Sequence, residues 1–277
     1  MKLILSHQNI DVNIYNEYKE IYNNKLHHTK ATSLIWAIEI ENVEIMKILL
    51  KHPKIDVNIQ SIVLDNEVES KYTPLIYAFI YNKIEAVKIL LSHPKIDVNK
   101  PIKSNDIEDS IRTPLFFAFE NSNDEIIKLL LSHPNIDVNM PIYENKNPKI
   151  RKTALTMAIQ NQKNEIVELL LSNPNIDVNA PLILNEDSAK SKSSPLNLAI
   201  NNDNQKAAIL LLSHHNIDVN IKTIKKINNN DLIKKEELSS LYFAIKKNNF
   251  EVIQILLSKQ NTNFNNKTMV FTKDNFY

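Results

Sequence analysis

The stretch that decides the fold is TPLIYAFIYNKIEAVKILLSHPKIDVN, residues 73–99. Thr73 can cap a helix with its hydroxyl, and Pro74 fits the first turn of that helix. After a polar break, residues 84–91 carry apolar side chains at helical spacing, which predicts a second helix. His93 precedes a proline, which disfavours helix in the residue before it, and Asp97-Val98-Asn99 is typical of a turn. The stretch therefore predicts a helix-turn-helix unit that closes in a second turn.

The same unit recurs through the chain. Its aspartate returns at positions 11, 56, 97, 137, 177 and 218, in steps of 45, 41, 40, 40 and 41 residues. A second landmark keeps this period: a Thr or Ser followed by Leu two residues later and by Ala five residues later, where the small alanine lets a neighbouring helix approach. It starts at Thr32, Thr73, Thr113, Thr153, Ser194 and Ser239. Neither helix could bury its apolar face alone, so we expect the units to stack.

These landmarks, T-P-L-x-x-A at the start of a unit and L-L followed by D-V-N at its end, resemble those of ankyrin-repeat proteins over nearly the whole chain. The resemblance implies an all-α, ankyrin-type solenoid of stacked helix-turn-helix repeats with long β-hairpin loops. It divides the chain into a partial repeat and its loop at 1–31, an array at 32–265, and a tail at 266–277. The array would hold about six helix pairs, with boundaries near 72, 112, 152, 193 and 238.

Two residue types of the ankyrin pattern are replaced. The family's histidine after T-P-L is absent, so its hydrogen bonds must be missing or rearranged; the replacements are Ile35, Ile76, Phe116, Thr156, Asn197 and Tyr242. The family's glycine between the two helices is also absent. Each residue in its place costs on the order of 1 kcal/mol if its backbone is left-handed, so we expect either modest stability or a reshaped turn. These residues are Glu41, Asn82, Ser122, Gln162, Asp203 and Asn248.

The period also exceeds the roughly 33 residues typical of ankyrin repeats. The excess lies between D-V-N and the next T-P-L, and it predicts elongated hairpin loops, here called fingers. They span residues 59–72, 100–112, 140–152, 180–193 and 221–238. Their formal charges are −2, 0, +3, 0 and +2, so this count predicts no basic stripe along the fingers.

The composition excludes many enzyme classes. The 277 residues include no glycine and no cysteine. The chain therefore has no Walker A loop, GxGxxG turn or GxSxG elbow, and no thiolate nucleophile, zinc ribbon or disulfide. The metalloprotease motif HExxH is absent as well. We expect a protein that is not an enzyme, with no cofactor, no metal and no small-molecule substrate.

Recurring histidines and aspartates have structural interpretations. Histidines one repeat apart would lie roughly 8–10 Å from one another, too far to share an ion whose bonds are near 2 Å. We expect each ring to sit, partly cationic, at a helix C-terminus, where positive charge is favoured. The adjacent pairs His27-His28 and His214-His215 have no third ligand at a familiar spacing. The recurring histidines are His7, His52, His93, His133 and His214. The D-V-N aspartates are expected to cap their own turns; they are Asp56, Asp97, Asp137, Asp177 and Asp218.

The charge balance argues against nucleic acid as a partner. Lys+Arg total 33 against 32 for Asp+Glu, and only two residues are arginine. The lysine-rich last finger is diluted by Asp231, Glu236 and Glu237, so we interpret it as solvated, with a nuclear-address or anionic-partner role as the lesser alternative. No apolar run approaches the roughly 20 residues that would span a membrane, and the start MKLILSHQ is no secretory signal. We expect a cytoplasmic protein with no membrane insertion.

Recognition of another protein remains as the expected function. In ankyrin-like proteins the binding surface is the concave face, built from the fingers and the exposed end of each first helix. Carried over by position, the candidate partner-binding residues are Tyr72, Ile80, Tyr81, Arg112, Glu120, Asn121, Lys152, Gln160 and Asn161. Tyr81 and Arg112 are the expected anchors, because aromatic residues and arginine dominate interface energetics. Trp36 stands beside Ala37 and is expected in the core.

The sequence therefore predicts a protein-binding scaffold or adaptor with a partner that it does not identify. Two alternatives stay open: a cryptic enzyme or enzyme inhibitor that uses the long fingers, and a fragment of a larger cytoskeletal or effector protein. The second alternative rests on the ends of the chain. The chain begins inside a second helix and closes with an apolar helix at 252–257. Neither end has the polar outer face that terminal repeats need, unless the tail at 266–277 covers the last helix.

Overall fold

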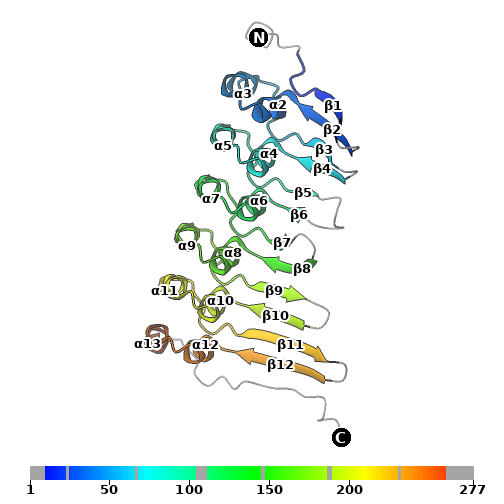
Figure 1. Ribbon diagram of the computed structural model, residues 1–277. Helices are drawn as coiled ribbons and strands as arrows, with labels where there is room; N and C mark the ends of the chain where they lie inside the picture. Colours follow the sequence, from blue (N-terminus) through cyan, green and yellow to red (C-terminus); the bar gives the residue numbers. More distant parts are fainter. Residues whose placement is uncertain are drawn as a thin grey trace. The chain divides into compact units, whose positions relative to one another are not determined.

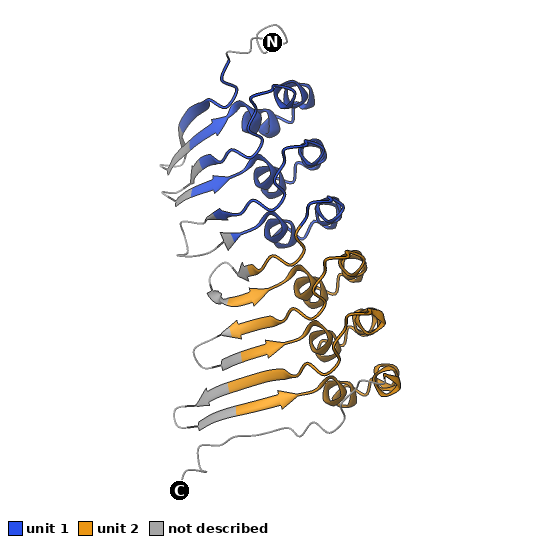
Figure 2. Ribbon diagram, turned by 180° about the vertical axis from the view of Figure 1, so that it is seen from behind, with its two compact units in different colours: residues 1–136 blue, residues 137–277 orange. Residues whose placement is uncertain are grey.

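The computed structural model describes residues 10–22, 25–65, 68–103, 111–144, 147–185, 189–229 and 232–259. The chain divides into two compact units, residues 1–136 and 137–277 (Figure 2). Within the described ranges, each unit contains three helix pairs and three β-hairpins (Figure 1). The stacked helix-turn-helix array with hairpin loops that the sequence predicts is thus confirmed. The predicted tail at 266–277 and His7 lie outside the described residues.

Short first helices and longer second helices alternate in both units. The pairs of unit 1 are α2 (Ser33–Glu39) with α3 (Val43–Leu50), α4 (Pro74–Ile80) with α5 (Ile84–Leu91), and α6 (Pro114–Glu120) with α7 (Asp124–Leu131). The pairs of unit 2 are α8 (Ala154–Gln160) with α9 (Asn164–Leu171), α10 (Pro195–Asn201) with α11 (Gln205–Ser213), and α12 (Ser240–Lys246) with α13 (Phe250–Ser258).

The predicted caps start the first helices. A hydroxyl accepts a hydrogen bond from the backbone N–H three residues later at five of the six starts, and the capping residues are Thr73, Thr113, Thr153, Ser194 and Ser239. Thr32 is the exception, since its side chain makes no cap hydrogen bond. Each such cap contributes about 1 kcal/mol, so the local sequence fixes where these helices begin.

The core of each repeat lies around the first-helix alanine. All six of these alanines are buried, as the close helix packing requires: Ala37, Ala78, Ala118, Ala158, Ala199 and Ala244. Phe79 and Phe119 are among the largest fully buried side chains. At the position of the family's histidine, Ile35, Ile76 and Phe116 are buried instead, so the hydrophobic effect replaces a polar contact there.

The turn between the two helices is left-handed in every repeat. The six residues at the expected glycine position have φ between 51° and 57°: Glu41, Asn82, Ser122, Gln162, Asp203 and Asn248. They are the only non-glycine residues with positive φ among those described. The structure therefore keeps the backbone shape that glycine would adopt freely, and each repeat carries the strain of a side chain there.

The fingers are β-hairpins, and within the described residues all of them except the finger at 100–112 pair with a neighbouring finger. In unit 1 the hairpins are β1 (Tyr15–Tyr22) with β2 (Lys25–Thr32), β3 (Ser61–Asp65) with β4 (Val68–Tyr72), and β5 (Ile102–Lys103) with β6 (Ile111–Arg112). In unit 2 they are β7 (Ile142–Glu144) with β8 (Asn147–Lys152), β9 (Leu182–Asn185) with β10 (Ala189–Ser193), and β11 (Thr223–Asn229) with β12 (Leu232–Leu238). The first two hairpins of unit 1 form one four-stranded antiparallel sheet, and the three hairpins of unit 2 form one six-stranded sheet.

An asparagine ladder joins successive repeats within each unit. The Asn58 side chain donates to the carbonyl of Lys95 at 2.7 Å and accepts from the backbone N–H of Asp97 at 2.8 Å. Asn13 makes the equivalent pair of bonds to Lys54 and Asp56 in unit 1. In unit 2, Asn139 bonds the backbone of Asn175 and Asp177, and Asn179 that of Asn216 and Asp218. The last residue of D-V-N thus connects one repeat with the next.

Among the described residues, no helix combines the length and the apolar character needed to cross a membrane.

Candidate binding surface

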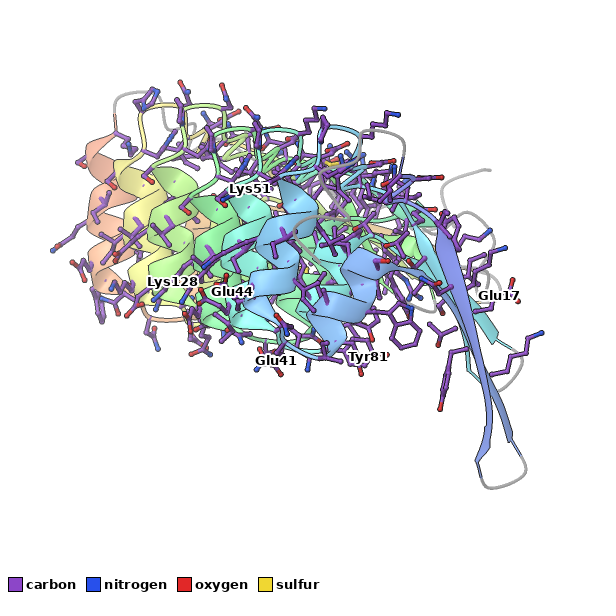
Figure 3. The ribbon with its side chains drawn as sticks, turned by 90° about the horizontal axis from the view of Figure 1, so that it is seen from above. Glu17, Glu41, Glu44, Lys51, Tyr81 and Lys128 are labelled. Carbon is purple, nitrogen blue, oxygen red and sulfur yellow. The ribbon has the colours of Figure 1, made fainter. Side chains whose placement is uncertain are left out.

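The exposed end of the first helices carries apolar side chains in two consecutive repeats of unit 1. Ile40, which follows α2, is 63% exposed, and Tyr81, at the same place after α4, is 45% exposed. In Figure 3, Tyr81 and Glu41 lie at the same end of the helices, whereas Lys51 lies at the other end. The later repeats have polar residues at this place: Asn121, Asn161, Asn202 and Lys247. The apolar character is therefore confined to the first two repeats.

Tyr81 is held in place by a contact between these two repeats. Its ring lies against that of Tyr77, with centroids 4.4 Å apart. The Tyr77 hydroxyl donates a hydrogen bond to the carboxylate of Glu39 at the end of α2. Burial, and then the hydrogen bond with Glu39, raise the pKa of Tyr77 well above its usual range, so Tyr77 stays a neutral donor. Tyr81 is thus a fixed aromatic side chain rather than a loose one.

Trp36 lies one helical turn before Ile40, and its predicted place in the core is wrong. The buried side chains of α2 are Leu34, Ile35, Ala37 and Ile38, while Trp36 is half-buried. Its ring meets the ring of Tyr18 edge-on, with centroids 6.0 Å apart. Tyr18 lies on strand β1 and is itself 51% exposed. The hairpin β1–β2 explains the difference, because it gives the indole a partner outside the helix stack.

We call Tyr18, Trp36, Ile40 and Tyr81 the aromatic face. All four belong to unit 1, and three of them were not among the residues that the sequence predicted. Alignment of the repeats would have identified Ile40, because it occupies the position that is equivalent to Tyr81. No such alignment identifies Tyr18, because its contact with Trp36 depends on how the first finger folds.

The other predicted residues of unit 1 differ in their exposure. Tyr72 and Ile80 are half-buried, and Glu120 is exposed. Asn121 is exposed, but its side-chain amide donates to the carbonyl of Phe79 at 2.8 Å, so it joins α6 to α4. The Arg112 guanidinium lies 5.9 Å from the ring centre of Phe116, and its Nε is buried without a hydrogen-bond partner in the described part of the chain.

Three predicted residues belong to unit 2. Lys152 at the end of β8 is half-buried, Gln160 at the end of α8 is half-buried, and Asn161 after it is exposed. At the position that follows each first helix, where unit 1 has Ile40 and Tyr81, the repeats of unit 2 have only polar residues: Asn161, Asn202 and Lys247. The structure therefore groups the predicted residues by unit, with six in unit 1 and three in unit 2.

The recurring histidines accept hydrogen bonds from the backbone. In each case Nδ1 accepts from the backbone N–H two residues later, at 3.2–3.3 Å, and the four rings are His52, His93, His133 and His214. Asn173 takes the same role in the fourth pair, with its Oδ1 at 2.9 Å from the N–H of Asn175. An acceptor nitrogen carries no proton, and burial lowers the pKa of His133 and His214, so the expectation of a partly cationic ring is wrong for these two.

The D-V-N aspartates cap their own turns, as predicted. Their Oδ1 atoms accept from the N–H two residues later at 2.9–3.0 Å, and the residues are Asp11, Asp56, Asp97, Asp137, Asp177 and Asp218.

His214 and His215 stack with ring centroids 4.5 Å apart. Within the described ranges, no three histidine or acidic side chains come together in a way that could hold a metal ion.

These histidines predict a loss of stability in acid. Burial lowers the pKa of His133 from its usual value of 6.5, and burial together with the charge of His215 lowers that of His214. The unfolded chain therefore binds more protons than the folded chain as pH falls below 6.5. The stability is present above pH 6.5 and is lost as pH falls through the two lowered values. We expect a lower free energy of unfolding at pH 5.5 than at pH 7.5 in urea titrations.

Asparagine is the matched substitution for these histidines, because Asn173 takes the place of the histidine in one repeat of the chain. His133→Asn/His214→Asn should keep both acceptors and show a smaller difference between the two pH values. An unchanged difference would show that other groups cause the acid sensitivity.

Comparisons with known proteins agree with this geometry. The family described as "Ankyrin repeats (3 copies)" matches the chain over residues 1–102, 64–142, 100–181 and 142–223. No curated protein matches the chain. The family matches together span residues 1–223 of the 277, and the repeats that they cover have the stacked helix pairs, left-handed turns and hairpins described above. The chain therefore belongs to the ankyrin-repeat family, whose members are typically protein-protein interaction modules.

Proposed function

We propose that this protein is a non-enzymatic scaffold or adaptor that binds another protein through the aromatic face of unit 1. The observation that carries the proposal is the exposure of Ile40 and Tyr81 at a place where the later repeats have polar side chains. Packing within the stack does not require an apolar residue there, because four repeats do without one. Exposed apolar side chains that gather on one surface mark interaction sites.

The aromatic side chains suit the centre of an interface. Tyrosine and tryptophan bury much apolar area and lose little conformational entropy, since each has two side-chain torsions. Trp36 is already restrained by Tyr18, and Tyr81 by Tyr77. Such preorganised side chains lose less entropy when a partner binds. Arg112, half-buried with its guanidinium over Phe116, is a cation in the third repeat of the same unit.

The test is affinity capture from a lysate, with the wild-type chain and two double variants as bait. Trp36→Ala/Tyr81→Ala truncates the aromatic face, and Tyr242→Ala/Phe250→Ala truncates two exposed aromatic residues of unit 2 as a matched control. We expect a protein that the wild type and the control retain and that the first variant retains about tenfold less, since hot-spot truncation costs more than 1 kcal/mol. Equal retention by all three baits would exclude the aromatic face.

Trp36 also allows a direct measurement, because it is the only tryptophan of the chain. Incorporation of 5-fluorotryptophan gives one ¹⁹F resonance, from a half-buried ring in the proposed interface. Addition of the captured partner should shift or broaden this resonance. A resonance that stays unchanged at saturating partner would place the interface elsewhere, even if capture succeeds.

A further inference from the structure

The six-stranded sheet of unit 2 gathers basic side chains on one of its faces. Residues directly opposite one another on antiparallel strands share a face, and residues along one strand alternate between faces. The pairing places Arg151 opposite Ile183, Ile183 opposite Lys192, Lys192 opposite Ile224, and Ile224 opposite Glu237. One row of side chains therefore crosses β8, β9, β10, β11 and β12, which lie side by side in Figure 1.

Lys226 and Lys235 lie two residues further along β11 and β12, directly opposite each other, and so on the same face. Like charges in such a pair are destabilising, so the arrangement is not explained by the stability of the sheet. We call Arg151, Lys192, Lys222, Lys226 and Lys235 the basic face. Lys222 joins it because its Nζ lies 3.4 Å from the Glu237 carboxylate.

Glu237 is the one carboxylate among the described side chains of these rows, and two lysines neutralise it. Lys235 lies 2.5 Å from its Oε1 and Lys222 lies 3.4 Å from its Oε2. The other three cations, Arg151, Lys192 and Lys226, are exposed, and none of them has an ion pair within the described part of the chain. On the opposite face, Lys225 stands directly across from Glu236. The charge is thus segregated between the two faces.

This segregation corrects the expectation that the fingers form no basic stripe. The formal charge of each finger does not show on which face of the sheet each side chain lies. It also does not show which fingers pair, and pairing brings β8, β10 and β11 into one sheet. The three uncompensated cations come from three different fingers.

We propose that the basic face binds an extended acidic segment of a partner protein, with carboxylates separated by apolar residues. The chemistry of the row supports this partner. Half-buried Ile183 and Ile224 separate the charged positions, so the face alternates charged and apolar side chains. Strands lie about 4.8 Å apart, which places Arg151 and Lys192 roughly 10 Å from each other. An extended segment with an acidic residue at every second or third position spans such distances.

A nucleic acid fits this face less well. Surfaces that bind single strands present aromatic side chains on which bases stack. The row has no aromatic position from Arg151 on β8 to Glu237 on β12, and Tyr143 of β7 stands opposite Arg151 at its end. The isoleucines would lie against phosphate or sugar. Charge complementarity therefore favours carboxylates that are interleaved with apolar groups.

The test measures fluorescence anisotropy of a labelled peptide of five Glu-Leu repeats, added to the full chain at low salt. The binding variant is Arg151→Gln/Lys192→Gln/Lys226→Gln. The control is Lys51→Gln/Lys54→Gln/Lys95→Gln, which removes the same charge from exposed residues of unit 1. We expect the wild type and the control to bind the peptide, the binding variant to bind about tenfold more weakly, and salt to weaken binding throughout.

Two outcomes would overturn the proposal. One is equal affinity of the binding variant and the control, which would show that only net charge matters. The other is a labelled oligo-dT that binds more tightly than the peptide and is equally sensitive to the binding variant, which would make the face a nucleic-acid surface. Circular dichroism of the variants, which replace exposed side chains only, verifies that they are folded.

Discussion

Replacement of Asn197 by alanine is expected to lower the free energy of unfolding by about 3 kcal/mol. Asn197 is fully buried in α10, at the position of the family's histidine. Its side-chain amide donates to the carbonyl of Ile221 at 2.9 Å and to the hydroxyl of Thr223 at 3.2 Å. Its carbonyl oxygen accepts from the hydroxyl of Ser240 at 2.6 Å. One side chain thus joins three segments of unit 2.

The cost arises from the groups that lose their partner. Ser240 can still donate to the carbonyl of Val219 at 3.0 Å, and Thr223 keeps its contact with Ser193 at 2.9 Å. The carbonyl of Ile221 has no such replacement among the hydrogen bonds of the described residues. An unsatisfied polar group costs about 1–3 kcal/mol, and the cavity left by the truncated side chain adds to this cost.

Urea denaturation followed by circular dichroism measures the effect. Asn201→Ala is the matched control, because Asn201 lies on the same helix and is exposed, and it should change stability by less than about 0.5 kcal/mol. A loss below about 1 kcal/mol for Asn197→Ala would contradict the network. The double variant Asn197→Leu/Ser240→Ala should recover part of the loss, because it removes the hydroxyl together with the amide.

Glycine at two left-handed turns is expected to stabilise the chain by about 1.5 kcal/mol. Gln162 has φ of 55° and Asn248 has φ of 51°. A side chain in this conformation costs about 1–2 kcal/mol, partly offset because glycine loses more entropy on folding. Asparagine tolerates the conformation better than glutamine, so most of the gain should come from Gln162→Gly. The two sites lie in different repeats, and their effects should add.

These sites are chosen because their side chains make none of the ion pairs of the other turns. Glu41 pairs with Lys83 at 2.8 Å and Asp203 with Lys247 at 2.5 Å, so glycine there would remove a contact as well. The control is Asn161→Gly, one residue before Gln162, with φ of −86°; it should destabilise the chain. Equilibrium unfolding in urea compares the three proteins. If Gln162→Gly brings no gain, the strain at that turn is relieved elsewhere.

The sequence predicted those features of the fold that depend on nearby residues. The Thr and Ser caps and the buried alanines each follow from a few consecutive positions and recur at a fixed period. For the glycine positions the sequence left a left-handed or a reshaped turn open, and the structure has the left-handed turn. The substitution of the family's histidine also predicted rearranged hydrogen bonds. These are found at Thr156, which forms a capping box with Thr153, and at Asn197.

Features that depend on pairing across repeats were not predicted. The contact of Trp36 with Tyr18 requires the first finger to fold back along α2. The row from Arg151 to Glu237 requires three hairpins to pair in one register, and a shift of one residue would move every side chain to the other face. No local pattern in the sequence specifies that register. The aromatic face was predicted only in part for the same reason, and the basic face was not predicted.

The asparagine ladder has a consequence for how such a chain can change its length. The side chains of Asn58 and Asn179 bond main-chain atoms of the following repeat. Every residue type provides the same main-chain atoms. The asparagine ladder therefore requires a particular backbone shape in the following repeat but no particular side chain. A repeat inserted or deleted as a whole period of about 40 residues would leave equivalent bonds on both sides of the change. Copy number can therefore vary independently of the surface residues that select a partner.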